Sequence, residues 1–416
     1  MTEKIWKICF AVLLLICILF AFTAVSFLRN TENTVQDTET SGYQKPYLDF
    51  LEKVYTEMDK NYYKPVSEAV YRNFVRTYKK KYLAKIKNRK NRIARIAHLG
   101  AGLLVNDLKD PEDTFTNFIP PKKADEYAKK IYGYEHGIGI EGHLVKGVYL
   151  IDHVQIRSEA FKKGIRARNV LLWINGLNIK DMTEEQIKAL LHPPIGTEIR
   201  LRIALIEERT TVPYTITCTE YFKETVREIP TDIPGVCYLK ISTFNKETAN
   251  DIKTYLKDHN PDNIEFLILD VMGNPGGPPL AVCETAGIFL PPGQKLVYYK
   301  KKNTPRFGLT SPSSEVRYNG RLIVLIDKKS GSASELLAGT LKAHRRAVIM
   351  GKESTAGFAF LKGAARFEDG SMLAMVTGIA YLFNGIPFGK DGVEPAFKIP
   401  QDVMDIQKFV LSQIKK

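Results

Sequence analysis

An uninterrupted apolar run stands near the start of this chain, ahead of segments in which apolar and polar positions alternate. Ile8–Leu28 contains no charged residue, and about 20 apolar residues are enough to cross the core of a bilayer. Lys4 and Lys7 precede the run, so the positive-inside bias places the short N-terminus in the cytoplasm. The pattern predicts a cytoplasmic tip and transmembrane anchor over residues 1–29 of a single-pass cell-membrane protein, with the bulk of the chain extracytoplasmic, on the periplasmic or extracellular side. Small residues at Ala24–Ser26 leave cleavage of the run as an alternative.

After the anchor, the pattern changes from polar to helical. Residues 30–46 are poor in apolar residues and predict a linker. Over residues 47–130 apolar positions recur about every 3.6 residues, which predicts helices. Residues 72–95 are rich in Lys and Arg, and this run would either attract an anionic membrane surface or form a solvated helix face. The apolar stripe that persists beneath the charges favours the solvated face.

Residues 131–210 predict a small domain that opens on a loop of glycine and apolar residues. The predicted order is strand, helix, strand, helix and strand, at residues 147–151, 158–165, 170–176, 183–191 and 196–203. This order resembles a PDZ domain. In that family the Gly-x-Gly-apolar loop offers backbone N–H groups to the C-terminal carboxylate of a peptide, which joins the sheet as an added strand. The resemblance implies peptide binding by Gly137, Ile138, Gly139 and Ile140.

Residues 211–416 alternate apolar strands with helical stretches. Phe266–Asp270 and Leu322–Ile326 are continuous apolar runs, which are typical of strands covered on both faces. The predicted fold class is therefore α/β (α+β), with a layered α/β core that follows the membrane helix, the helical segment and the PDZ-like domain.

Composition and charge exclude several classes of protein. The 416 residues are 44% hydrophobic and 25% charged, which is ordinary for a globular protein and excludes collagen-like or wholly disordered chains. The net charge of +14 would suit an anionic partner, but the predicted extracytoplasmic location argues against nucleic acid. The five cysteines form no C-x-x-C pair and the seven histidines are scattered, so neither a metal site nor a cofactor is expected.

Two segments of the last domain carry residues suited to chemistry. In the first, a strand ends at Asp270 and runs into the glycine-rich turn 273–277, where bare backbone N–H groups can hold an oxyanion. In the second, an apolar strand feeds the small-residue turn 327–334, which opens a helix. A serine at that turn can act as a nucleophile, because it lies next to the positive end of the helix dipole and to backbone N–H groups. Ser332 or Ser334 could instead serve only as the N-cap of the helix.

The order Asn-Pro-Gly-Gly, then Ser-Ala-Ser-Glu after a strand, resembles the carboxyl-terminal processing (tail-specific) peptidases of the serine/lysine family S41. The likeness covers most of the chain beyond the anchor. It implies that Ser332 is the nucleophile and that the N–H groups of Ala333 and of Gly276 or Gly277 form the oxyanion hole. It also implies polypeptide substrates, bound by their C-terminal tails, and no cofactor.

The chain departs from the family pattern at the general base. Aligned without gaps, Gly357 stands at the position of the family lysine, and Phe115 stands where some relatives have a histidine. Met272 replaces a usual arginine. Three other residues remain as tentative bases: Lys362, Lys352 and His344. A lysine can act in this way only if desolvation lowers its pKa.

Two hypotheses of function therefore stay open. The first is a membrane-anchored serine endopeptidase that selects extracytoplasmic proteins by their C-terminal tails through the PDZ-like domain. The second is a catalytically inactive relative that binds protein tails as a scaffold or regulator. The presence of a Lys or His nitrogen near the Ser332 hydroxyl separates them.

Overall fold

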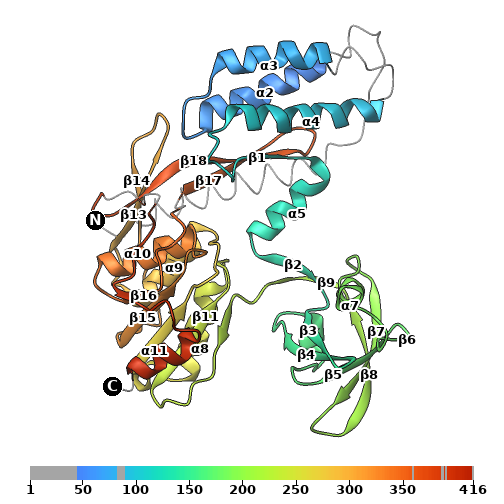
Figure 1. The fold of residues 1–416 in the computed structure, drawn as a ribbon, viewed down its shortest axis with the longest axis vertical. Coiled ribbons are helices and arrows are strands. Elements are labelled where there is room, and N and C mark those ends of the chain that lie inside the picture. Colours follow the sequence, from blue (N-terminus) through green and yellow to red (C-terminus); the bar gives the residue numbers. More distant parts are fainter. Residues whose placement is uncertain (1–44, 82–89, 358–359, 386–387, 389–390, 415–416) are drawn as a thin grey trace. The chain divides into compact units, whose positions relative to one another are not determined.

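The computed structural model describes residues 45–81, 90–357, 360–385, 388 and 391–414 (Figure 1). The chain divides into two compact units, Met1–Phe50 and Leu51–Lys416. The first unit contributes to the described residues only the beginning of helix α2 (Lys45–Asn61), and all later elements belong to the second unit.

Three helices begin the second unit. The rest of α2 is followed by α3 (Glu68–Lys81) and α4 (Lys90–Leu108), and Leu51, Val54 and Met58 recur on one face of α2 and are fully buried. Helix α3 packs on α4, where the Tyr78 hydroxyl donates a hydrogen bond to the carbonyl of Ile96. The short strand β1 (Asn117–Ile119) and helix α5 (Pro121–Ile131) complete this region.

The next domain is an antiparallel sheet with two helices. Its strands lie in the order β3 (Ile140–Val145), β4 (Val148–Val154), β5 (Val170–Ile174), β7 (Glu198–Leu205) and β8 (Thr210–Thr217), with β6 (Leu177–Asn178) beside β5. Helices α6 (Glu159–Lys162) and α7 (Glu184–Leu191) complete it, and Thr183 and Gln186 form a capping box at the start of α7. Strand β3 lies at the edge of the sheet. The ribbon formed by β2 (Tyr134–Gly137) and β9 (Thr219–Phe222) joins both ends of the domain to the rest of the chain.

The core of the last domain is a six-stranded sheet. The strand order is β10 (Val226–Glu228), β11 (Val236–Ile241), β12 (Phe266–Asp270), β15 (Arg321–Ile326), β16 (Val348–Gly351) and β19 (Phe397–Lys398), and all neighbours from β11 onward are parallel. The two continuous apolar runs of the sequence are the adjacent strands β12 and β15. Because they are parallel, the loops that follow them emerge at the same edge of the sheet.

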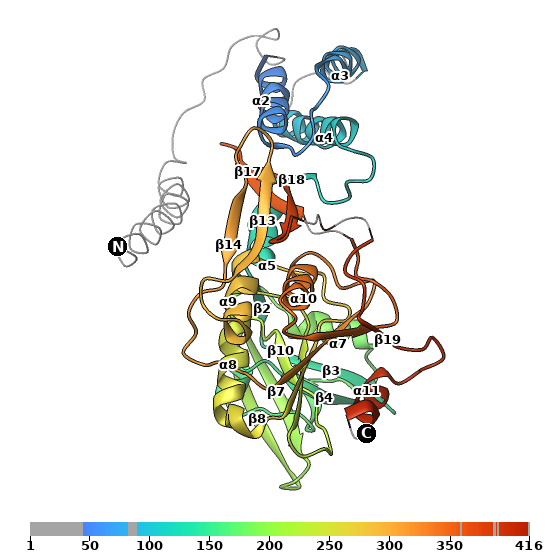
Figure 2. The same ribbon diagram turned by 90° about the vertical axis from the view of Figure 1, so that its left-hand side faces the viewer.

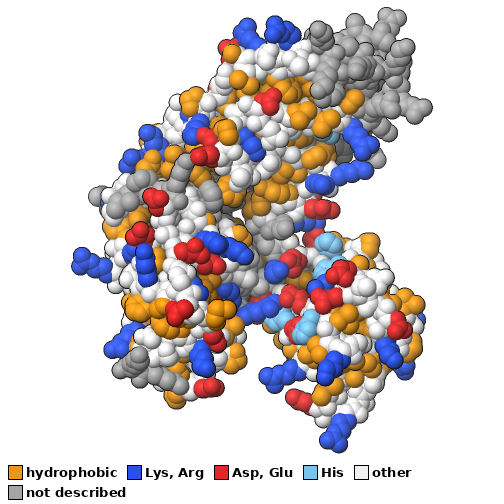
Figure 3. Space-filling view, in the orientation of Figure 1, with side chains coloured by type: hydrophobic (Ala, Val, Ile, Leu, Met, Phe, Trp, Pro, Cys, Tyr) orange, Lys and Arg blue, Asp and Glu red, His pale blue; other side chains and the backbone are white. Residues whose placement is uncertain are grey.

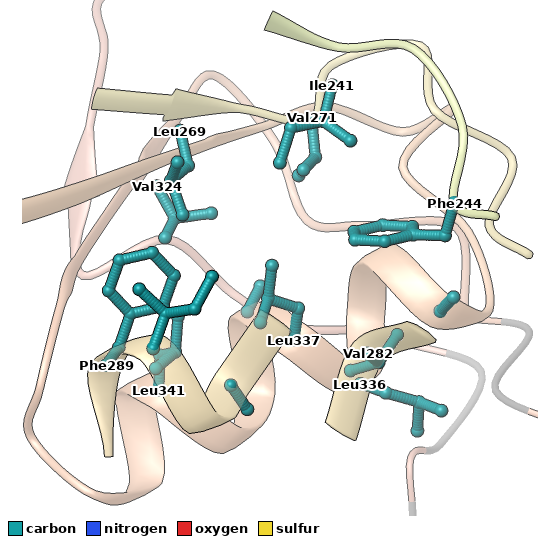
Figure 4. Packing of buried hydrophobic residues seen from close by; sticks show 14 of the residues in the cluster. Ile241, Phe244, Leu269, Val271, Val282, Phe289, Val324, Leu336, Leu337 and Leu341 are labelled. Atoms are coloured by element: carbon teal, nitrogen blue, oxygen red, sulfur yellow. The ribbon is translucent and has the colours of Figure 1, made fainter. Parts of the chain in front are cut away.

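Helices cover both faces of this sheet. Helices α8 (Thr248–Asp258), α9 (Pro279–Phe289) and α10 (Ala333–Ala343) line one face, with the one-turn η2 (Pro261–Asn263) after α8. Figure 4 shows Leu269 and Val324 of the strands packed against Phe289, Leu337 and Leu341. Helix α11 (Ile406–Ile414) contributes the buried Val410 to a second apolar cluster with Tyr238, Ile268 and Leu325. The mixed α/β fold predicted from the sequence is confirmed.

A second sheet lies against α10. It has the order β1, β18 (Met372–Leu382), β13 (Lys295–Lys301) and β14 (Phe307–Thr310), and β17 (Phe360–Arg366) also pairs with β18 (Figure 2). Helix α10 contacts both β13 and β18. The helix that begins at Ser332 is therefore held between this sheet and the parallel one.

The expected membrane anchor requires correction. Among the residues that the structure describes, no helix has the length and apolar content needed to cross a bilayer. The segment to which the anchor was assigned, Ile8–Leu28, lies outside the described residues. The predictions of a single-pass anchor and of an extracytoplasmic, cell-membrane location are thus not supported.

Candidate active site

Ser332 lies in the turn that joins β15 to α10. Its φ of 51° and ψ of −110° fall outside the regions that non-glycine residues usually adopt. The side chain stays partly exposed, whereas Ala333 immediately after it is fully buried at the first position of the helix. A strained serine between a strand and a helix N-terminus presents its hydroxyl outward, next to the positive end of the helix dipole.

The buried residue Asn274 ties this turn to the glycine-rich turn after β12. Its carbonyl accepts hydrogen bonds from the Gly331 N–H (2.9 Å) and from the Ser334 hydroxyl (3.0 Å). Its side-chain amide donates to the carbonyl of Ile241 at the end of β11 (3.0 Å). One asparagine therefore fixes the loops that follow three adjacent strands, and it sets the position of Ser332 relative to the turn 273–277.

The serines on either side of Ser332 have structural roles. Ser330 is fully buried and its hydroxyl donates to the carbonyl of Val271 (2.8 Å). Ser334 is also fully buried, and its hydroxyl donates a hydrogen bond to the carbonyl of Asn274. Ser332 is the one serine of this turn that keeps part of its surface open, so the geometry separates it from Ser334 independently of the family resemblance.

Gly276 and Gly277 allow the two turns to approach closely. A Cβ built on Gly276 would lie 2.8 Å from Cβ of Ser332 and 2.9 Å from the nitrogen of Ala333, and Gly276 has a φ of 110°. A Cβ on Gly277 would lie 2.2 Å from the carbonyl oxygen of Phe244. Any larger residue would push the bend away from Ser332.

The expected oxyanion donors differ in availability. The Gly276 N–H already donates to the side-chain oxygen of Asn274 (2.8 Å), so it is engaged within the protein. Neither the Gly277 N–H nor the Ala333 N–H donates to an acceptor in the described part of the chain. These two N–H groups, one next to Ser332 in the chain and one in the bend that packs against it, are therefore free to bind an incoming oxygen.

Glu335 is a buried carboxylate that sequence reasoning missed as a site residue. It accepts hydrogen bonds from the Ser332 N–H (2.8 Å), the Thr355 hydroxyl (2.8 Å) and the Gly357 N–H (2.7 Å). The signal that could have found it is the Ser-x-x-Glu spacing of a capping box. Glu335 thus holds both the backbone of Ser332 and the segment 355–357.

Two of the three tentative bases are engaged elsewhere. The Lys352 amine donates to the carbonyl of Gln401 (3.0 Å), beyond the end of β16. His344 caps the opposite end of α10 from Ser332, where its ring stacks on Phe383 and its Nε2 lies 2.8 Å from the carbonyl oxygen of Lys295. A helix of eleven residues is about 16 Å long, so His344 is out of reach of the Ser332 hydroxyl.

Lys362 lies in strand β17, at an exposed position. Its amine lies 3.8 Å from the centroid of the Phe115 ring. Loss of hydration lowers the pKa of Lys362 below the usual value of lysine, and the charge of Asp113 opposes that shift. Lys362 follows the segment 355–357 in the chain, and residues 358–359 between them lie outside the described residues.

Lys240 stands behind the glycine-rich turn. Its amine forms an ion pair with the buried carboxylate of Asp270 (2.8 Å) and donates to the carbonyl of Met272 (2.5 Å). Tyr238 donates a further hydrogen bond to Asp270 (2.9 Å). Lys240, on the neighbouring strand β11, thus neutralises the charge of Asp270. Position 272, where the resemblance led us to expect an arginine, carries a methionine.

The loop predicted to bind peptides is ordered by its own domain. The Ile138 side chain is fully buried, its carbonyl accepts from the Ala160 N–H (3.3 Å), and its own N–H faces the carbonyl of Leu191 (3.5 Å). Gly139 has a φ of 83°, and a Cβ there would lie 2.1 Å from Cβ of Ser158. Ile140 begins β3, so the loop leads directly onto the free edge of the sheet.

No cluster of metal ligands accompanies these residues. Within the described ranges, no three His, Cys, Asp or Glu side chains lie close enough together to hold a metal ion. The described cysteines Cys218, Cys237 and Cys283 are not in disulfides, and burial raises the pKa of each thiol, to about 12 for Cys283. The partly exposed hydroxyl of Ser332 is therefore the candidate nucleophile of this site.

Comparison with known proteins agrees with this geometry. Residues 235–399, which contain both turns, match the model of Peptidase family S41. The chain is 27% identical over 307 residues to the carboxy-terminal processing protease CtpB of Bacillus subtilis (strain 168), over 72% of this chain and 62% of that protein. It is 23% identical to CtpA of the same organism, over 71% of this chain and 63% of that protein. The chain thus spans less than two thirds of these curated relatives.

Solved structures share the fold. The photosystem II D1 C-terminal processing protease superposes with a TM-score of 0.51 and 20% sequence identity, over 88% of this chain and 97% of that chain. A putative S41 protease from Bacteroides fragilis NCTC 9343 gives a TM-score of 0.51 at 14% identity, over 89% of this chain and 92% of that chain. Residues 235–399 therefore form a domain that matches Peptidase family S41, and these two solved structures share the fold of the chain.

Proposed function

We propose that this protein is a serine endopeptidase that cleaves polypeptides, with Ser332 as its nucleophile. The observation that carries the proposal is the position of Ser332, a strained and partly exposed residue packed against the glycine bend 276–277. The N–H groups of Ala333, next to Ser332, and of Gly277, in the facing bend, donate to no acceptor in the described residues. The match of residues 235–399 to Peptidase family S41 supports the same chemistry.

In the proposed reaction the Ser332 oxygen attacks a peptide carbonyl carbon while a base removes the hydroxyl proton. The carbonyl oxygen gains the negative charge, and the N–H groups of Ala333 and Gly277 stabilise it. The carbon–nitrogen bond then breaks, and the leaving amine takes the proton from the protonated base. Water attacks the resulting ester of Ser332 and releases the second product.

Lys362 is the base that we propose. Its lowered pKa raises the fraction of neutral amine, which is the form that accepts a proton. Strand β17 follows the segment 355–357, which Glu335 holds beside the Ser332 backbone. Contact with Ser332 requires that the Lys362 amine leave the ring of Phe115.

This assignment predicts a pH dependence. The base is active when neutral, so kcat/KM should rise as the pH increases through the pKa of Lys362, which lies below that of an ordinary lysine. Lys362→Arg should lose activity at every pH, because a guanidinium keeps its proton. Lys352→Arg is the matched control and should reproduce the parent profile. A Lys362→Arg variant with an unchanged profile would exclude Lys362 as the base.

We further propose that the domain of β3–β8 is PDZ-like and binds the C-terminal tail of the substrate. The support is the outer edge of β3, which has no strand partner in the described residues, and the glycine loop at its start, in which Gly139 has a φ of 83°. The names of the two Bacillus relatives, which describe carboxy-terminal processing, agree with this assignment.

The second candidate is a tail-binding relative without catalysis. It is favoured by glycine at position 357 and by the contacts of Lys352 and Lys362, which are with Gln401 and Phe115 rather than with Ser332. In this case the chain would bind polypeptide tails as a scaffold or regulator and leave them intact.

One experiment separates the candidates. An unfolded polypeptide is offered to the full chain with either a free or an amidated C-terminus, and cleavage is followed by mass spectrometry. We expect cleavage of the free-tailed substrate and at least about tenfold slower cleavage of the amidated one, because the amide removes the charge that the loop N–H groups bind. Binding without cleavage would support the scaffold, and equal rates for the two substrates would reject tail recognition.

A further inference from the structure

A pocket of about 650 Å³ lies between the small domain and strand β10 of the core. Edge strand β3, strand β4 and helix α7 line one side, and Glu224, Arg227 and Glu228 line the other. Acidic and histidine side chains lie together over β3 and β4 on the face shown in Figure 3. The size is that of a typical ligand site rather than of a packing defect.

The pocket contains polar atoms whose hydrogen bonds are not made. In the described residues, six buried side-chain nitrogen or oxygen atoms have no hydrogen-bond partner, and three of them line this pocket. They belong to the hydroxyl of Tyr149, which is fully buried, to Nε2 of His153 and to Oε2 of Glu224. His153 Nε2 and Glu224 Oε2 lie 2.9 Å apart and pair with each other, although without hydrogen-bond alignment. The Tyr149 hydroxyl is thus the fully buried polar atom of this pocket that has no hydrogen-bond partner in the described residues, and because buried polar groups are almost always paired, it points to a ligand that supplies one.

The fixed charges of the pocket are mainly negative. Its carboxylates outnumber its lysine and arginine side chains by four to two, and they are Glu141, Asp152, Glu224 and Glu228 against Lys188 and Arg227. Both cations are already neutralised, Arg227 by Glu141 (2.9 Å) and Lys188 by Glu184 (2.5 Å). In the described part of the chain, Asp152, Glu224 and Glu228 have no lysine or arginine partner. In a protein of net charge +14, such a pocket selects a cation.

The position of the pocket indicates that the cation belongs to a polypeptide. Ile140, Glu141 and Gly142 of β3 line it, and among the described strands β3 pairs with β4 alone, so its outer edge can accept an added strand. A β-bulge between Glu141 and Gly142 turns the backbone at this point. An extended chain on this edge would carry a side chain directly past the carboxylates.

We propose that this pocket binds a lysine or arginine side chain of the substrate, a few residues upstream of its C-terminus. The inference rests on the proposed tail binding and adds to it the chemical class of the preferred tail. The Glu224 carboxylate accepts from the ammonium or guanidinium group, and Asp152 and Glu228 add to the negative potential. Glu224 lies in the connection between β9 and β10.

The test uses the full chain with Ser332→Ala, which leaves bound peptides intact. Peptides labelled at the N-terminus carry lysine or its neutral isostere norleucine at one of the last five positions, and fluorescence anisotropy gives their Kd. We expect one position at which lysine binds about five- to tenfold more tightly than norleucine, with the advantage reduced by high salt. Glu224→Gln should remove the advantage, with folding verified by thermal unfolding. Glu185→Gln, on the exposed side of α7, is the matched control and should keep it.

Three outcomes would overturn the proposal. Equal affinities for lysine and norleucine peptides at all five positions would show that the pocket does not distinguish a cationic side chain from a neutral one. A lysine preference that survives Glu224→Gln would place the recognition elsewhere. Absence of any peptide binding would reject this inference together with tail binding, and it would leave the chemistry of Ser332 to its own test, because acylation of that serine needs no bound tail.

Discussion

Replacing Ser332 by alanine is expected to lower kcat/KM on an unfolded polypeptide by about a thousandfold or more, with little change in the free energy of unfolding. The substitution removes the attacking oxygen. It keeps the backbone N–H that donates to Glu335 and a side chain of similar size at the same φ of 51°. Activity is measured with a denatured protein substrate, and stability by thermal or denaturant unfolding.

The matched control for this prediction is Ser334→Ala. The Ser334 hydroxyl is fully buried and donates to the Asn274 carbonyl, so its loss should cost about 1 kcal/mol of unfolding free energy. Turnover should fall far less than in Ser332→Ala, because Asn274 still accepts from the Gly331 N–H. If the two variants lost activity equally, Ser332 would have no special role.

Removing the Glu335 carboxylate is expected to give the second large effect, on both stability and activity. Glu335→Ala leaves the Ser332 N–H, the Thr355 hydroxyl and the Gly357 N–H without their buried acceptor, which should cost about 3–5 kcal/mol. The turn that carries Ser332 and the segment 355–357 would then separate, and turnover should fall at least about a hundredfold. Unfolding curves and steady-state kinetics measure the two losses.

Two milder variants test the cause of this effect. Glu335→Gln keeps one carbonyl oxygen for Thr355 and Gly357 but faces the Ser332 N–H with an amide NH₂, so it should remain more stable than Glu335→Ala while losing turnover. Thr355→Val removes one donor and the acceptor of the Val393 N–H (2.7 Å), and should reduce stability without reaching the Glu335→Ala value. A fully active Glu335→Ala variant would contradict a positioning role for this carboxylate.

The layered core could be predicted from the sequence because its central strands are continuous apolar runs. Phe266–Leu269 and Leu322–Ile326 are apolar without interruption, and they lie in the central strands β12 and β15. The helix-like pattern at 183–191 likewise indicated the helix that the structure shows as α7. Such local signals depend on neighbours in the chain, which the sequence displays directly.

The details of the site depend on contacts between distant segments, and these the sequence could not display. Ser332 and Ser334 are equivalent in pattern, and only the carbonyl of Asn274 shows that Ser334 faces inward. Gly276 and Gly277 were equal candidates as donors until the side chain of Asn274 was seen to engage one of them. The ion pair between Lys240 and Asp270 could not be predicted for the same reason, because only the pairing of β11 with β12 brings the two side chains together.

The most direct test of the central claim is the mass of the protein after reaction with a serine-directed acylating probe. The account predicts that the full chain gains the mass of one acyl group, located by peptide mapping on Ser332, and that Ser332→Ala gains none while Ser334→Ala still reacts. An unlabelled chain, or a label that persists in Ser332→Ala, would contradict the assignment of Ser332 as the nucleophile.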